Sequence, residues 1–211
     1  TKRPPIDTEY FETFNRENVT LVDIKKNPVK NLNSDGITLV SGDKIQADII
    51  VFATGFDAMT GSLLKLGIVG RKNLTLAEAW QNGPRTFLGL GTNGFPNLFM
   101  ITGPGSPSVL TNMPRAIEQH VEWITNCMNH CDEVGAMTIE AENTAVLNWT
   151  DHVTAVANQT LLPKANHSWY FGGNIPGKPR TFMPYSAGLD KFRSNCEQIA
   201  KSGYIGFKIT Q

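Results

Sequence analysis

Two adjacent cations near the start of the chain have side chains suited to binding anions. Lys2 and Arg3 stand in the stretch "TKRPP", where the prolines stiffen the backbone. Neighbouring cations can divide the work, so that one binds a phosphate and the other stabilises a developing oxyanion. Solvated surface charge is the commoner role of such a pair when residue types alone are considered, and both interpretations stay open at this point.

A large indole on an irregular segment is the second chemical signal. Trp169 stands in "SWYFGGNIPGKPRTFMPY", residues 168–185, which also holds a Gly-Gly pair, two Gly/Pro turns and the cations Lys178 and Arg180. Glycine frees the backbone and proline removes amide donors, so neither a helix nor a sheet strand is expected here. A loop of this composition needs a reason to carry a tryptophan.

Two glycine-containing turns follow apolar runs that have the composition of buried strands. The runs are 49–52 in "DIIVFATGFD" and 98–101 in "FPNLFMITGPGSPS". Continuous rather than alternating apolarity predicts strands buried on both faces, as in a parallel sheet. Ligands of open α/β sheets bind beyond the carboxyl ends of the strands, so we predict one candidate site at 54–57 and 103–113.

The residues of these turns have specific uses if the site exists. In "ATGFD", the Thr54-Gly55 turn would let a dinucleotide or another backbone approach closely, and Asp57 could accept a hydrogen bond from a hydroxyl. Helix-start amides after "GPGSPS" would suit an electron-rich ligand edge. A tight strand exit and a plain connecting loop would leave the same patterns without any ligand.

Other segments predict the elements that must position these residues. Alternation in 18–24 predicts a strand, and two short strands are expected around Ser41-Gly42-Asp43. Helical spacing with Pro114 in a first turn predicts a helix after residue 108, and further helices are expected within 141–162 and 190–203. The opening residues 1–16 are expected to form a loop.

Composition argues against several classes of function. Lys+Arg and Asp+Glu both number 19, so the net charge of zero gives no support to a nucleic-acid partner or an anionic membrane surface. No apolar run reaches the roughly 18 residues of a membrane span. Three cysteines without a framework spacing predict a reducing, cytoplasmic location. We expect no metal site, because Cys127 and Cys131 lack a second ligand pair. The four histidines are not accompanied by a nucleophile elbow, so no Ser-His-Asp triad is expected.

Five segments in order resemble the C-terminal part of Baeyer–Villiger monooxygenases, and the resemblance extends over essentially all 211 residues. It is nearer to the phenylacetone and steroid monooxygenase branch than to cyclohexanone monooxygenase. The segments are "TKRPPIDTEYFETFNRENVTLVD", "DIIVFATGFDAMTG", "GPRTFLGLGTNGFPNLFMITGPGSPS", "AIEQHVEW" and "SWYFGGNIPGKPR".

The resemblance implies an α/β fold, namely the FAD/NAD(P)-binding Rossmann-like two-domain flavoprotein fold, present here only in part. Residues 1–47 would be the C-terminal tail of the NADP-binding domain. Residues 48–211 would be the C-terminal half of the FAD-binding domain, with a mobile lid loop at about 165–185. The family's glycine-rich phosphate loops and its fingerprint motif would lie upstream, so the N-terminal remainder of the same enzyme is the expected partner.

The implied activity is insertion of one oxygen atom of O₂ next to a ketone carbonyl, giving an ester or lactone. FAD would be bound tightly, NADPH would donate hydride, and the reaction would pass through a flavin C4a-peroxide and a Criegee intermediate. Two alternatives remain open: an N- or S-oxygenating flavin monooxygenase, and a non-catalytic fragment that acts as an interaction module.

Matching positions carry the family's roles onto this sequence. Arg3 would be catalytic and stabilise anionic intermediates, while Lys2 would meet the 2′-phosphate of NADPH. Trp169 would close over the nicotinamide side on the lid, and the backbone amide of Met113 would meet the flavin ring. The remaining expected cofactor-binding residues are Thr54, Gly55 and Asp57, and the expected substrate-lining residues are Ser108, Val109, Leu110 and Thr111.

Overall fold

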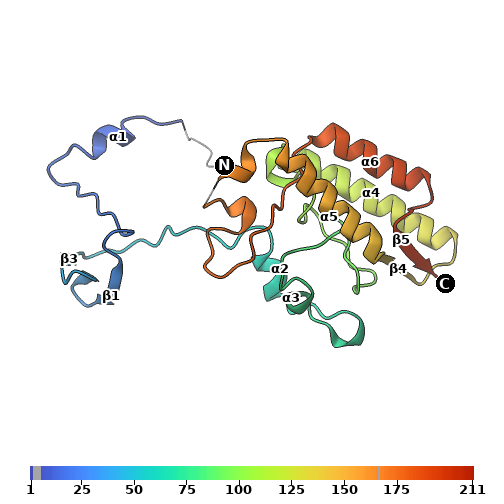
Figure 1. Ribbon diagram of the computed structural model, residues 1–211, viewed down its shortest axis with the longest axis horizontal. Coiled ribbons are helices and arrows are strands. Elements are labelled where there is room, and N and C mark those ends of the chain that lie inside the picture. The colour runs from blue at the N-terminus through green and yellow to red at the C-terminus, as the bar shows by residue number, and fades with distance from the viewer. Residues whose placement is uncertain (2–5, 166) are drawn as a thin grey trace. The chain divides into compact units, whose positions relative to one another are not determined.

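The computed structural model describes residues 1, 6–165 and 167–211, and it divides into two compact units (Figure 1). The smaller unit ends at Gly55, and the larger unit is Phe56–Gln211 together with Thr1. The predictions for Lys2 and Arg3 fall outside the described residues. The division into cofactor domains at 47/48 stays a prediction, because a compact unit is defined by its internal contacts and not by what it binds.

The smaller unit contains a three-stranded antiparallel sheet. Its strands are β1 (Val29–Asn33), β2 (Gly36–Leu39) and β3 (Lys44–Gln46), in the order β1-β2-β3. The Asp35 N–H donates to Asn33 Oδ1 at 3.0 Å in the first turn, a local bond typical of Asn in turns. The two short strands predicted around 41–43 are confirmed. The predicted N-terminal loop contains one helical turn, α1 (Tyr10–Thr13).

Three predicted strands are wrong. Residues 18–24 and 49–52 form no strand, and Leu21, Ile49 and Val51 are 77%, 82% and 81% exposed. Residues 98–101 form no strand either, although Met100 is buried and its N–H donates to Leu90 O at 2.8 Å. A strand needs a neighbouring backbone that pairs with it residue after residue, and the single bond from Met100 to Leu90 does not make such a ladder in the described chain. Apolar pattern records a preference for burial and says nothing about that partner.

The larger unit is built on three long helices. They are α4 (Met113–Glu133), α5 (Asn143–Asn158) and α6 (Leu189–Lys201), and α4 and α6 lie side by side (Figure 1). All three correspond to predicted helices. Pro114 stands in the first turn of α4, where its missing N–H costs nothing, and Gly203 follows α6 with a φ of 71°.

Shorter elements connect these helices. Strand β4 (Thr138–Ala141) pairs antiparallel with β5 (Phe207–Thr210), so the chain's last strand returns to the start of α5. Short helical segments complete the described part of the unit: α2 (Gly61–Lys65), α3 (Leu76–Ala79), η1 (Arg71–Asn73), η2 (Ser108–Leu110), η3 (Leu162–Lys164) and η4 (Trp169–Phe171). None of the described helices is long and apolar enough to cross a membrane.

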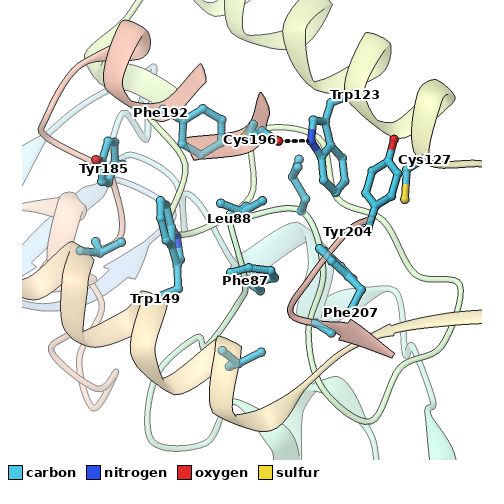
Figure 2. Packing of buried hydrophobic residues seen from close by; sticks show 14 of the residues in the cluster. Phe87, Leu88, Trp123, Cys127, Trp149, Tyr185, Phe192, Cys196, Tyr204 and Phe207 are labelled. Atoms are coloured by element: carbon cyan, nitrogen blue, oxygen red, sulfur yellow. Dashed lines mark hydrogen bonds between the residues drawn. The ribbon is translucent and has the colours of Figure 1, made fainter. Parts of the chain in front are cut away.

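The core of the larger unit is aromatic (Figure 2). Each buried aromatic ring contributes about 150–250 Å² of buried surface, so this cluster provides much of the unit's stability. Trp123 Nε1 donates to Cys196 O at 2.9 Å, which ties α4 to α6. The cluster includes Phe87, Leu88, Leu90, Trp123, Trp149, Tyr170, Phe171, Tyr185, Phe192, Tyr204 and Phe207.

The three cysteines are free and buried within this core. Burial raises the pKa of the Cys127 thiol to about 12, and it raises the pKa of Cys196 to about 12 as well. The reactive thiolate is therefore almost absent at neutral pH, and these side chains pack as small apolar groups.

Candidate functional site

Backbone hydrogen bonds connect three irregular segments at the centre of the candidate site. The glycine-proline loop, residues 103–108, bonds to residues 183–185 twice: Gly105 N–H donates to Met183 O at 2.6 Å, and Tyr185 N–H donates to Ser106 O at 2.7 Å. Residues 181–183 in turn bond to the Trp169 segment, since Met183 N–H donates to Tyr170 O at 2.9 Å. The predicted lid and the predicted cofactor loop are thus neighbours.

Helix α5 packs against the glycine-proline loop through Trp149. Trp149 Nε1 donates to Gly105 O at 2.9 Å, and the Trp149 ring stacks on Tyr185 with centroids 5.3 Å apart (Figure 2). Gly105 has a φ of 90°, and a Cβ there would lie 2.8 Å from Thr86 Oγ1. Only glycine meets both conditions, so the glycine of "GPG" is required by the loop itself.

The predicted lid has a packed base. Ser168 Oγ accepts the Tyr170 N–H at 3.1 Å and starts η4, and Gly172 ends it with a φ of 71°. Tyr170 and Phe171 are buried in the core, while Trp169 is half-buried and meets the Tyr170 ring edge-on with centroids 4.7 Å apart. The buried rings of Tyr170 and Phe171 therefore anchor residues 168–171 to the core. The lid's mobility stays a prediction.

The predicted substrate segment forms the short helix η2 and the residue after it. Ser108 is buried with a φ of 44°, and its hydroxyl donates to Met59 Sδ at 3.5 Å. Val109 and Thr111 are half-buried, and Leu110 is 36% exposed. The segment therefore anchors one residue and leaves three with accessible surface, which a pocket lining requires.

The start of α4 offers one main-chain donor of its first turn that has no acceptor among the described residues. Asn112 Oδ1 accepts the Arg115 N–H at 3.3 Å, Asn112 O accepts the Ala116 N–H at 3.1 Å, and Pro114 has no N–H. The Met113 amide remains, at the positive end of a 21-residue helix. An amide there would suit the electron-rich edge of a flavin ring, which is the role predicted for Met113.

Asp57 has a partner that the sequence did not predict. Lys178 Nζ, from the Trp169 loop, forms an ion pair with Asp57 Oδ1. Next to it, Asn174 Nδ2 donates to Phe56 O at 3.0 Å. The 121-residue separation of Asp57 and Lys178 explains why local patterns gave no signal for this pair. Thr54 and Gly55 belong to the smaller unit, and their roles stay predictions.

His120 is a core residue rather than a proton donor. Its Nδ1 accepts the Thr102 N–H at 2.8 Å, and its ring has no exposed surface. Desolvation lowers the pKa of His120 to about 4, so the ring is neutral at physiological pH. Within the described part of the chain, no three His, Cys, Asp or Glu side chains gather in a way that could hold a metal ion.

A literal G-x-G-x-x-G spacing, unused in the sequence-based prediction, occurs at Gly89, Gly91 and Gly94. Phe87 N–H donates to Gly91 O at 2.8 Å across a tight turn, and Gly94 N–H donates to Glu140 Oε1 at 2.7 Å. No helix follows directly in the described chain, so the strand–turn–helix context of a dinucleotide loop is missing. These glycines serve a turn and its packing.

No family model matches the chain. The chain is 41% identical over 208 residues to a cyclohexanone 1,2-monooxygenase from an Acinetobacter species, covering 99% of this chain and 38% of that protein. It is 38% identical over 206 residues to a phenazine N-monooxygenase from Lysobacter antibioticus, covering 98% of this chain and 38% of that protein. The chain thus spans well under half the length of these curated relatives.

Solved structures match the fold as well. A closed structure of cyclohexanone monooxygenase superposes with a TM-score of 0.92 at 40% identity, covering 100% of this chain and 39% of that one. An oxidised steroid monooxygenase bound to NADP superposes with a TM-score of 0.82 at 48% identity, covering 97% of this chain and 37% of that one. The part shared with both is an incomplete copy of their fold.

Proposed function

We propose that this chain, which matches the C-terminal part of Baeyer–Villiger monooxygenases in sequence and fold, works within a longer FAD- and NADPH-dependent enzyme of that family. The observation that carries the proposal is the match to cyclohexanone monooxygenase over 99% of the chain. The proposed reaction inserts one oxygen atom of O₂ next to a ketone carbonyl and yields an ester or lactone. The partner in this proposal is the N-terminal remainder of the enzyme.

The cofactors supply the difficult chemistry when bound: FAD activates O₂ and NADPH provides the hydride. The chain's own residues bind, orient and enclose. We assign the Met113 N–H to the flavin edge, because it is the unused donor at the start of α4. We assign 108–111 to the ketone pocket, because Ser108 is anchored while the next three residues keep accessible surface.

Trp169 is assigned to the nicotinamide side of NADPH, on the loop that closes the site. Its half-buried indole and the buried rings of Tyr170 and Phe171 support this role, because a packed base can hold an aromatic plate in a defined orientation. Closing such a loop excludes water from the reacting atoms, and it commits the bound cofactor.

Arg3 is proposed to stabilise the anionic intermediates, and Lys2 is proposed to bind the 2′-phosphate of NADPH. Variants of these two residues test the proposed function. In the intact protein Arg3→Ala should abolish ester formation while NADPH oxidation remains measurable, since loss of one oxyanion-stabilising group costs about 10²–10³ in rate. Lys2→Ala is the matched control: it should raise the KM for NADPH and leave the rate at which bound ketone is oxygenated unchanged. Ester formation by Arg3→Ala at the normal rate would contradict the proposed catalytic role.

Oxygenation at nitrogen or sulfur is the second candidate. The observation that favours it is the 38% identity to a phenazine N-monooxygenase, which is close to the 41% identity to a ketone-oxidising relative. Product analysis after parallel incubations with a cyclic ketone, an aryl sulfide and a nitrogen heterocycle separates the candidates. Lactone as the main product supports the first, and N-oxide or sulfoxide without lactone supports the second.

We also propose a cytoplasmic location. The three cysteines of the chain are all free thiols, and each is buried where it packs as an apolar side chain. Secreted proteins of similar cysteine content use such residues mostly in disulfides, whereas a reducing compartment keeps thiols free.

A further inference from the structure

Two polar contacts tie the Trp169 loop to the start of the larger unit. Lys178 Nζ forms an ion pair with the Asp57 carboxylate, and Asn174 Nδ2 donates to Phe56 O at 3.0 Å. Both contacts come from the tip of the loop, between Gly172 and Thr181. The base of the loop is held separately, by its buried rings and by the Thr181 N–H, which donates to Phe171 O at 3.3 Å.

The Asp57–Lys178 pair is more buried than the ion pair Arg193–Glu197 on the surface of α6. The Lys178 and Asp57 side chains are 12% and 32% exposed, whereas both partners of Arg193–Glu197 are 54% exposed. Solvent screens exposed pairs strongly and partly buried pairs much less. A partly buried lysine without its carboxylate would carry a poorly compensated charge, so the ion pair favours the position of the loop tip next to Asp57.

Two glycines provide the space for this pair. A Cβ at Gly172 would lie 2.8 Å from Lys178 Cδ, and a Cβ at Gly61 would lie 2.6 Å from Asp57 Cγ. Gly172 has a φ of 71°, so the turn also requires it. Gly61 begins α2, where its backbone conformation suits any residue. Space for the carboxylate therefore explains Gly61 better than backbone conformation does.

We propose that Asp57 and Lys178 form a clasp that positions the Trp169 loop, with Lys178 as a positioning residue for NADPH. This function of the clasp rests on the proposed monooxygenase. The path from Lys178 to Trp169 is short: Lys178 N–H donates to Ile175 O at 3.3 Å, and Ile175 N–H donates to Gly172 O at 3.1 Å, directly after η4. Releasing the clasp would loosen the loop tip and leave the packed base in place.

Hydrogen exchange on the intact protein tests the clasp itself. Lys178→Met keeps the apolar stem and removes the charge, and it should speed exchange of amides in 172–181 by about tenfold, the effect of losing one charged hydrogen bond. Lys178→Arg keeps the charge and should stay within a few-fold of the parent. Lys164→Met, an exposed lysine just before the loop, is the control and should change nothing. Unchanged exchange in Lys178→Met would overturn the proposal.

Steady-state kinetics test the positioning role. Lys178→Met and Asp57→Asn should each raise the KM for NADPH several-fold and increase the NADPH consumed without product, with kcat changed less. The double variant should be no worse than either single one, because both remove the same interaction. An unchanged KM in both single variants would overturn the positioning role. A parent protein that does not oxidise NADPH would refute the proposed function instead, and the exchange experiment would still decide the clasp.

Discussion

His120 makes folding stability depend on pH. The unfolded chain protonates this ring near its ordinary pKa of 6.5, whereas desolvation holds the folded pKa at about 4. The unfolded state therefore binds more protons between these values, and stability is lost as the pH falls from 6.5 toward 4. The loss amounts to about 3 kcal/mol at 1.36 kcal/mol per pKa unit. Above pH 6.5 this histidine no longer makes the free energy of unfolding depend on pH.

His120→Asn tests this expectation, because the amide oxygen of Asn can replace Nδ1 as the acceptor for Thr102 and does not titrate. Urea unfolding of the intact protein at several pH values between 4 and 7 measures the difference between parent and variant. That difference should shrink by about 3 kcal/mol toward pH 4. A parallel profile for His120→Asn would show that another group carries the dependence.

For single residues, the sequence predicted the chemical role of a side chain but not the residue that it contacts. Asp57 was predicted as an acceptor after a glycine turn, and the structure pairs it with Lys178 from a loop 121 residues away. Local spacing holds no record of such a contact, since it depends on how the intervening helices pack.

The glycine-proline loop and helix α5 act together at the scale of elements. Trp149 Nε1 donates to Gly105 O at 2.9 Å, and Trp123 Nε1 makes the same kind of bond, also 2.9 Å, to Cys196 O in α6, outside the loop. Trp149→Phe and Trp123→Phe should each cost about 1–3 kcal/mol of unfolding free energy, because a buried carbonyl loses its donor. Urea unfolding checks this cost.

The two variants should separate in their kinetics. Only Trp149→Phe disturbs the loop that leads into the proposed ketone pocket at 108–111, so only this variant should raise the KM for the ketone. Equal effects of both variants on that KM would mean that the loop is positioned by other contacts, such as the bonds between Gly105 and Met183 and between Tyr185 and Ser106.

Helices were predictable where strands were not, for a physical reason. A helix satisfies its backbone within its own segment, so periodicity, Pro114 and Gly203 were enough to predict α4 and the end of α6. The runs 49–52 and 98–101 needed strand neighbours that no described segment supplies. Their apolar composition predicted burial, which holds for Met100 and does not hold for Ile49 and Val51.

At the scale of the whole molecule, the chain contains parts of a site rather than a closed one. The groups proposed to meet the cofactors, namely the Met113 amide, the Trp169 loop and the Asp57–Lys178 pair, all belong to the larger unit. A dinucleotide also needs a phosphate cradle. The one G-x-G-x-x-G spacing, at Gly89–Gly94 in a tight turn, has no helix directly after it in the described chain. The match to well under half of each relative's length is consistent with that division.

The mass and colour of the native protein are therefore the decisive whole-molecule test. We expect an intact polypeptide well above 23.2 kDa, the mass of these residues, carrying FAD that absorbs visible light and is released on denaturation. The reason is that the pyrophosphate of FAD needs main-chain donors of a glycine-rich helix start, which a longer chain would provide. A mass near 23.2 kDa with no second chain and no flavin would leave the ancestry intact. That result would contradict the proposed activity and favour an interaction module. A polypeptide well above this mass that carries no flavin would mean that the protein does not retain FAD.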